Sequence, residues 1–95
     1  MSSAEMFLLP TRFDYSYYRE FGELFKPLIE SASCKEIILN FSDVQYLDSS
    51  ALGMMVMLRK RFVNKDRHIK IKGARGATLE ILTVANMQKI FEFVL

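Results

Sequence analysis

Segments with strand character alternate with helical segments along the sequence, and this alternation limits the possible folds more than any other feature. Strands are expected at residues 6–9, 37–41, 68–72 and 90–95, where short apolar or alternating runs stand between turn residues. Helical patterns fill the three intervals. Strands that alternate with helices are joined by crossover connections, which favours a parallel sheet. The sequence therefore predicts an α/β fold with the order β-α-β-α-β-α-β, a mostly parallel four-stranded sheet and about three helices.

The three helices have recognisable limits in the sequence. The first is expected to begin at a capping residue, Asp14 or Ser16, and to end or kink at Pro27. Four residues recur in it at helical spacing and are predicted to pack in the core: Tyr18, Phe21, Phe25 and Leu28. The second helix is expected over residues 51–64 and the third over residues 77–85.

The strand at residues 37–41 is almost continuously apolar, which is typical of a parallel sheet covered by helices on both faces. Residues 68–72 instead alternate between polar and apolar, as in a strand with one wet face. We therefore expect residues 37–41 to form the central strand. Binding sites in such folds usually lie in loops at the carboxyl ends of the strands. The segment from Ser42 to Ser50, which follows the central strand, is the predicted position of the site.

Length and composition exclude several classes of protein. Ninety-five residues are enough for a single domain, residues 1–95, with one core. One cysteine, Cys34, and one histidine, His68, allow neither an internal disulfide nor a Cys/His zinc site within one chain. Residues 1–5 lack the features of a signal peptide, and the longest apolar run, residues 51–58, is too short to cross a bilayer. We therefore expect a cytoplasmic protein that is not bound to a membrane and holds no cofactor.

Charge is divided unevenly along the chain. Residues 1–50 carry four basic and eight acidic side chains, whereas residues 51–95 carry nine basic and three acidic ones. A basic stripe between Arg59 and Arg75 is the best candidate for binding nucleic acid. It comes without a DNA-binding motif, an RNA-binding aromatic signature or a metal finger. We therefore expect a solvated or partner-steering surface and no direct nucleic-acid partner.

Catalysis by a serine would need a base close to Ser49 or Ser50. The single imidazole, His68, begins a different strand, and no orienting acid can be identified from the spacing. The sequence therefore predicts a binding protein and not an enzyme.

The segment DSSALG at residues 48–53 places an acid, two hydroxyls and a glycine at the start of the second helix. One interpretation is a structural helix cap at Asp48. At about 100° per residue, Leu52, Met55 and Phe62 fall on the face turned to the sheet. The outer face then carries Ser50, Met54, Met57 and Arg61.

Two methionines beside an exposed serine form an adaptable apolar patch that suits a protein partner. The alternative is that a neighbouring helix covers Met54 and Met57 as ordinary core. A phosphate on Ser50 would add about two negative charges near Asp43 and Asp48 and would repel a partner packed on the patch. The predicted partner-binding residues are Asp43, Asp48, Ser49, Met54, Met57 and Arg61.

Four segments together resemble the STAS family, specifically the bacterial anti-sigma factor antagonists. They are LPTRFD (9–14), LNFSDV (39–44), DSSALG (48–53) and ILTVAN (81–86). The resemblance implies a non-enzymatic protein that binds an anti-sigma factor, often a serine kinase, and so frees a sigma factor. The kinase phosphorylates a serine at the helix entrance, which abolishes binding, and a PP2C-type phosphatase restores it. By the motif, that serine is Ser50, and Asp48 matches the acidic residue beside it.

The sequence departs from the family pattern in two places. Ala51 stands where many members have glycine, and the sequence ends at Leu95, where many members continue into a further helix. Without that helix we expect part of one sheet face to be open to a partner or to a second copy, as in a homodimer. The alternative function is a STAS subunit that assembles constitutively on a larger complex, such as a transporter, without phosphorylation.

Overall fold

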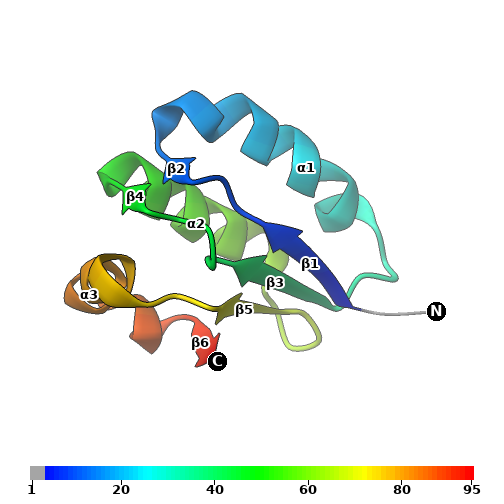
Figure 1. The fold of residues 1–95 in the computed structure, drawn as a ribbon. Coiled ribbons are helices and arrows are strands. Elements are labelled where there is room, and N and C mark those ends of the chain that lie inside the picture. Colours follow the sequence, from blue (N-terminus) through cyan, green and yellow to red (C-terminus); the bar gives the residue numbers. More distant parts are fainter. Residues whose placement is uncertain (1–3) are drawn as a thin grey trace.

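The computed structural model describes residues 4–95, which form a four-stranded sheet, a separate pair of short strands and three α-helices (Figure 1). In chain order the elements are β1 (Ala4–Leu8), β2 (Arg12–Phe13), the 3-10 helix η1 (Tyr15–Tyr17), α1 (Tyr18–Glu30), β3 (Glu36–Asn40), β4 (Tyr46–Leu47), α2 (Ser49–Phe62), β5 (His68–Lys72), α3 (Gly76–Val84), the 3-10 helix η2 (Met87–Lys89) and β6 (Glu92–Val94). The predicted alternation is confirmed, because α1, α2 and α3 separate β1, β3, β5 and β6. The sequence patterns did not predict β2, β4, η1 or η2.

The large sheet has the strand order β1-β3-β5-β6, and all three pairings are parallel. Along the chain, each strand of this sheet lies beside the next strand of the same sheet. Right-handed connections between such neighbours all pass over one face of the sheet. On that face Ile37 and Ile71 are fully buried, whereas Ile38 and Lys70 on the opposite face are only half-buried. The prediction that helices cover both faces is therefore wrong.

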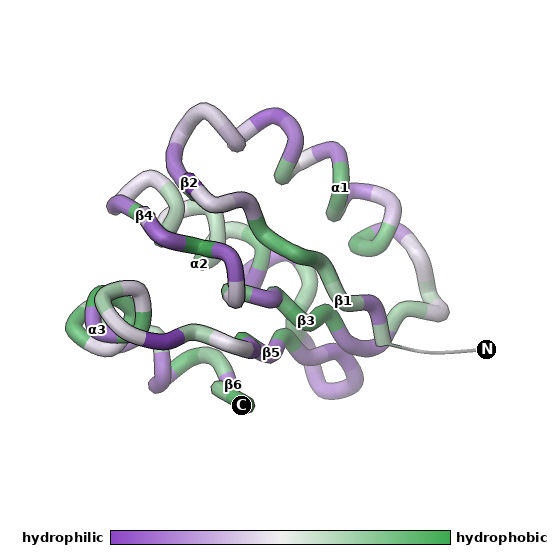
Figure 2. Tube along the Cα trace, viewed as in Figure 1, coloured by the Kyte–Doolittle hydropathy of each residue, from purple (hydrophilic) through white to green (hydrophobic). Residues whose placement is uncertain are grey.

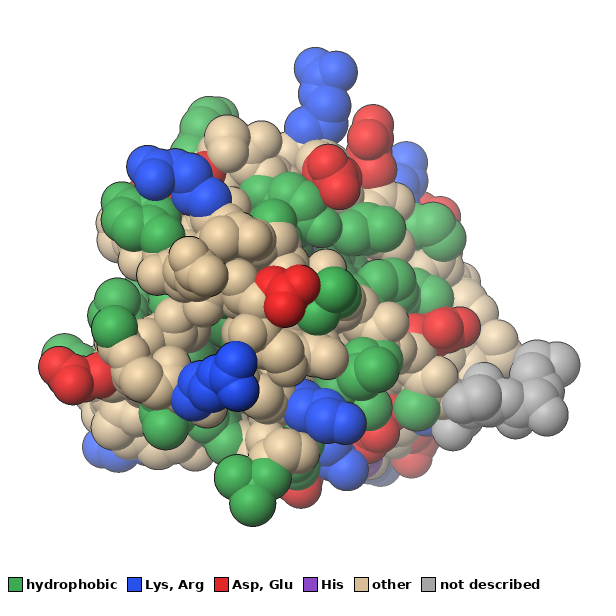
Figure 3. Space-filling model, viewed as in Figure 1, with side chains coloured by type: hydrophobic (Ala, Val, Ile, Leu, Met, Phe, Trp, Pro, Cys, Tyr) green, Lys and Arg blue, Asp and Glu red, His purple; other side chains and the backbone are tan. Residues whose placement is uncertain are grey.

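The open face of the sheet carries a mixed row of side chains. The strand register aligns Met6, Ile38, Lys70 and Glu92 across all four strands. Ile38 thus lies beside Met6 of the edge strand β1 on the open face, although the run of apolar residues in β3 predicted that Ile38 is covered by a helix. Figure 3 shows hydrophobic side chains exposed between charged ones on the side of the molecule seen in Figure 1.

Aromatic side chains from α1 and the neighbouring segments form the core under this helix. Phe13 is fully buried, and its ring centroid lies 5.6 Å from that of Phe21 and 6.1 Å from that of Phe41. Along α1 hydrophobic and hydrophilic residues alternate (Figure 2), as expected for a helix with one buried face. Phe21 and Phe25 are buried as predicted. Tyr18 is not, since 58% of it is exposed.

Helix α1 continues through Pro27 to Glu30, so the helix does not end near Lys26. Proline removes the hydrogen bond to the carbonyl four residues earlier, which here belongs to Glu23. Both Glu23 and Pro27 lie on the exposed side of α1, so water can solvate that carbonyl. Leu28 packs against the core after the proline and keeps the last turn in place.

Asp14 caps η1, which leads into α1, and not α1 itself, which begins after Tyr17 without a side-chain cap. The carboxylate of Asp14 accepts several hydrogen bonds. The Ser16 hydroxyl and the Ser16 amide donate to Oδ1 at 2.5 and 3.0 Å, and Arg12 Nε lies 2.6 Å from Oδ2. The hydrogen bond from the Ser16 hydroxyl is the largest effect on the pKa of Asp14 and lowers it; burial opposes this, and the Ser16 amide and Arg12 lower the pKa further. A lowered carboxyl pKa stabilises the fold above about pH 4, and this stabilisation is lost as the pH falls through the pKa of the folded state.

We therefore expect Asp14→Asn to lower the Tm at pH 7 and to have a much smaller effect at about pH 2 to 3. Thermal unfolding of both proteins, followed by circular dichroism across this pH range, measures the difference. A difference in Tm that stays constant with pH would contradict a role for the ionised carboxylate.

Candidate functional site

Asp48 caps α2 with its side chain, as the sequence predicted. Its Oδ1 accepts hydrogen bonds from the amides of Ser50 at 3.0 Å and of Ala51 at 3.3 Å. The φ of Asp48, −130°, is extended, as is usual for a residue that caps a helix. Two of the free amides at the helix start are therefore already bonded before any ligand or modification is present.

Ser49 and Ser50 are the first two residues of α2, and they differ in exposure. Ser49 is exposed, whereas Ser50 is half-buried at the end of a groove. Within residues 4–95, neither hydroxyl forms a hydrogen bond, since only the backbone amide of Ser50 is bonded. The Ser50 oxygen is therefore not sequestered by its own chain.

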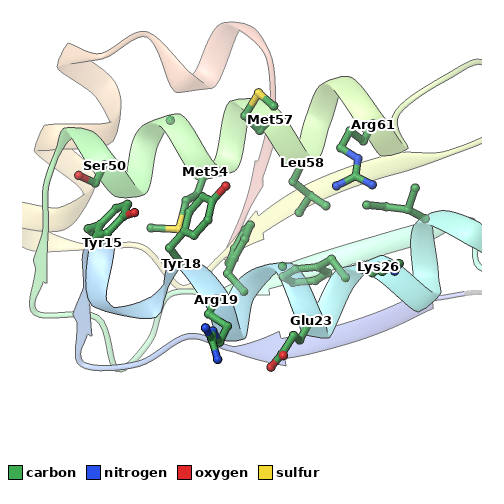
Figure 4. Close-up of a pocket in the computed structure, with 15 residues that line it drawn as sticks. Tyr15, Tyr18, Arg19, Glu23, Lys26, Ser50, Met54, Met57, Leu58 and Arg61 are labelled. Carbon is green, nitrogen blue, oxygen red and sulfur yellow. The ribbon is translucent and has the colours of Figure 1, made fainter.

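The groove lies between α1 and α2 and has a volume of about 520 Å³. Ser50 and Tyr15 lie at one end of it, Met54 lies between the helices, and Arg61 lies at the other end (Figure 4). The wall on the α1 side carries aromatic and apolar residues, namely Tyr15, Tyr18, Phe21, Phe25 and Ile29. The groove is therefore mainly apolar, with the hydroxyl of Ser50 near one end.

The structure places the two methionines of α2 in different environments. Met54 is 6% exposed and Met57 is 57% exposed. Of the two alternatives for the methionines, coverage by a neighbouring helix is confirmed for Met54, because α1 packs beside α2 and covers that side of the helix. Met57 and Arg61 do lie on the exposed side, and both line the groove.

Asp43 lies apart from the groove, in an exposed turn after β3. This turn is held closely against the start of α3. The buried hydroxyl of Thr78 donates to the carbonyl oxygen of Val44 at 3.1 Å, and Gly73 has a φ of +75°. A Cβ at Gly73 would lie 2.5 Å from the Oγ of Ser42.

The structure thus brings Ser50, Met54, Met57 and Arg61 together and leaves Asp43, Asp48 and Ser49 outside the groove.

We expect Thr78→Val to lower the free energy of unfolding by about 1–3 kcal/mol, because the buried carbonyl of Val44 would lose its donor. Urea unfolding at neutral pH measures the loss. Thr83→Val, at an exposed position of the same helix, is the matched control and should change stability by less than about 1 kcal/mol. Equal losses in the two variants would contradict the anchoring role of Thr78.

Three residues of the basic stripe between Arg59 and Arg75 bind other parts of the fold. Arg59 donates through Nε to the carbonyl of Ile90 at 2.9 Å, and Arg67 donates to the carbonyl of Leu28. Lys70 lies 3.2 Å from a carboxylate oxygen of Glu36, and this hydrogen bond raises the pKa of Lys70. Each of these three side chains is therefore bound to another part of the fold.

The residues of α1 that line the groove were not predicted as part of the site. Tyr18 was assigned to the core because its spacing from Phe21 and Phe25 is helical. The sequence signal for exposure is that Tyr15 and Tyr18, at the start of the helix, carry hydroxyls that can remain in water. In the structure their rings stack, with centroids 5.4 Å apart. Their exposure follows from their position before the first buried turn.

Within residues 4–95, no helix combines the length and the apolar character needed to cross a bilayer. A family model described as "STAS domain" matches residues 6–95. A STAS-domain containing protein of Pseudomonas aeruginosa (strain UCBPP-PA14) is 25% identical over 81 residues, which cover 85% of this chain and 78% of that protein. A solved structure from Thermotoga maritima, a candidate anti-sigma factor antagonist, matches with a TM-score of 0.82 at 18% identity, over 98% of this chain and 80% of the other. This last likeness shows that the two chains share a fold.

Proposed function

The chain belongs to the STAS domain family, and on that premise we propose that it is an anti-sigma factor antagonist switched by phosphorylation of Ser50. In its unphosphorylated form it binds an anti-sigma factor that is also a serine kinase, and so frees a sigma factor or an equivalent regulator. A PP2C-type phosphatase removes the phosphate. All of these proteins act in the cytoplasm. The partner packs on the groove that Met54, Met57 and Arg61 line together with Ser50, and Asp43, Asp48 and Ser49 lie outside that contact.

The observation that carries this proposal is the hydroxyl of Ser50, which has no hydrogen bond within residues 4–95 and lies at the end of an apolar groove. Asp48 already bonds the nearby amides of the helix, so a phosphate would not be needed to complete the cap. Its negative charge would also be tolerated at the positive end of α2. The fold can therefore accept the phosphate while a bound partner cannot.

The surroundings of Ser50 support a binding module over an enzyme. Among residues 4–95, those that line the groove include no histidine and no cysteine, and His68 lies at the start of β5. Activation of a serine as a nucleophile needs a base within hydrogen-bond reach. The exposed methionine Met57 and the apolar wall of α1 instead suit contact with a protein surface.

Intact-mass measurement after incubation with ATP and the cognate kinase tests the proposal. We expect the wild-type chain and Ser49→Ala to gain one phosphate and Ser50→Ala to gain none. Ser49 is the sharper control because it is more exposed than Ser50 and is its neighbour in sequence. A wild-type chain that gains no phosphate would contradict the switch and favour a constitutive STAS subunit of a larger complex.

A further inference from the structure

Two glycines lie inside helices where the free domain gives no reason for them. Gly22 in α1 and Gly53 in α2 both line the groove, and neither has the positive φ that would favour glycine. Outside its own helix, a Cβ at either position would meet nothing within 4 Å. Glycine is less favourable than alanine inside a helix. Both positions therefore lower helix stability with no packing benefit among the described residues.

The two glycines interrupt facing lines of larger side chains. On α1, Gly22 lies four residues from both Tyr18 and Lys26, and on α2, Gly53 lies four residues from Met57. Residues at this spacing share one side of a helix. Each glycine thus leaves a gap between larger groups in the wall of the groove. Small residues at a contact allow the axis of another helix to come closer.

Apolar surface extends beyond the cavity itself. Tyr15 is 68% exposed, Tyr18 is 58% exposed and Met57 is 57% exposed. A small molecule held in about 520 Å³ would leave much of this rim in water, whereas a helix about 10 Å across would cover it. Methionine and aromatic side chains are typical of grooves that bind amphipathic helices.

Charge around the groove favours an acidic occupant. Three cationic side chains, Arg19, Lys26 and Arg61, line it together with one acidic side chain, Glu23. Within residues 4–95, none of these three cations forms an ion pair. In Figure 4 the side chain of Arg61 reaches from α2 toward α1 at one end of the groove. Carboxylates beside the apolar stripe of a bound helix would complement these charges.

We propose that the groove between α1 and α2 binds an amphipathic helix of the partner protein that carries acidic residues beside its apolar stripe. The proposed function supplies the existence of a partner, on which this inference rests, and the groove defines what that partner presents. The bound helix packs closely against Gly22 and Gly53. A phosphate on Ser50, at one end of the groove, then stands next to the acidic residues of the helix and repels them.

Two synthetic helical peptides test this proposal. They share a leucine stripe at i, i+3, i+4 and i+7 and differ only in the flanking residues, which are glutamate in one and lysine in the other. In fluorescence titrations against the full chain, we expect the glutamate peptide to bind at least about 10-fold more tightly than the lysine peptide at low salt.

The two glycines provide the decisive variants. Gly22→Ala and Gly53→Ala are each expected to raise the Tm by about 3–6 °C and to weaken binding of the glutamate peptide by roughly 10-fold, since a methyl group would fill the approach to the backbone. Thr83→Ala, an exposed position on α3 outside the groove, is the matched control. It should also raise the Tm and leave the affinity unchanged.

Several results would overturn the proposal. These are equal affinities for the two peptides, no saturable binding of either, or alanine variants that bind as tightly as the wild type. A concentration-dependent dimer that Gly53→Ala disrupts would assign the groove to a second copy of the chain instead. A Ser50→Asp variant separates this inference from the proposed function. If it binds the peptide normally while the glycine variants do not, the groove proposal stands and the switch at Ser50 fails.

Discussion

Met54→Glu is expected to unfold much of the protein population under mild heating, whereas Met57→Glu should leave the fold intact and abolish capture of the partner. The two residues have the same side chain and lie three positions apart on α2, but Met54 is 6% exposed and Met57 is 57% exposed. A carboxyl group at a buried site has its pKa raised by up to about 3 units, which costs about 4 kcal/mol at neutral pH. This is a large part of the stability of a small domain.

Thermal unfolding and partner binding measured on the same preparations separate the two effects. We expect the Tm of Met54→Glu to fall by roughly 15–30 °C and that of Met57→Glu by only a few degrees at most. Met54→Leu and Met57→Leu keep the side-chain volume and serve as controls for the added charge. If Met57→Glu lost as much stability as Met54→Glu, Met57 would belong to the core and the groove would be closed in solution.

Local patterns in the sequence predicted the order of the strands and helices because each short element has its own periodicity and boundary residues. Strand β5 coincides with the predicted residues 68–72, and Asp48 caps α2 as expected. The faces of the sheet were not predictable in the same way. Ile38 reads as buried from β3 alone, and its half-exposed position follows only from the strand order, which places Met6 and Lys70 beside it on the open face.

The candidate site was predicted only on the α2 side for a similar reason. A projection of α2 separates its faces relative to the sheet, but it contains no information about a second helix packed alongside. Met54 is therefore buried under α1, although the projection of α2 placed it on the outer face. Tyr18 is exposed, although its spacing in α1 predicted a core position. Gly22 could not be assigned to a site from the sequence, because it lines a groove that forms only where the two helices pack together.

Ser50→Asp is expected to lower the affinity for the cognate anti-sigma factor by about 10- to 100-fold, and Ser50→Ala to change it by less than about 3-fold. A coupling free energy of about 1–3 kcal/mol corresponds to a change of about 5- to 150-fold, and a carboxylate carries about half the charge of a phosphate. An added acidic residue in the first turn of α2 interacts favourably with the helix dipole, so the Tm should not fall. Loss of binding would then reflect repulsion of the partner and not damage to the fold.

Isothermal titration of the purified partner against four proteins measures this effect: the wild type, Ser50→Ala, Ser50→Asp and Ser49→Asp. Ser49→Asp is the matched control, because it adds the same charge one residue earlier, at an exposed position that does not line the groove. We expect it to weaken binding by less than about 3-fold, since the charge stays in water. Equal effects of the two aspartates would mean that any negative charge near the start of α2 disturbs the partner, and Ser50 would lose its specific role. Normal binding by Ser50→Asp would contradict the switch itself, because the groove would then accept a negative charge at its end without losing its occupant.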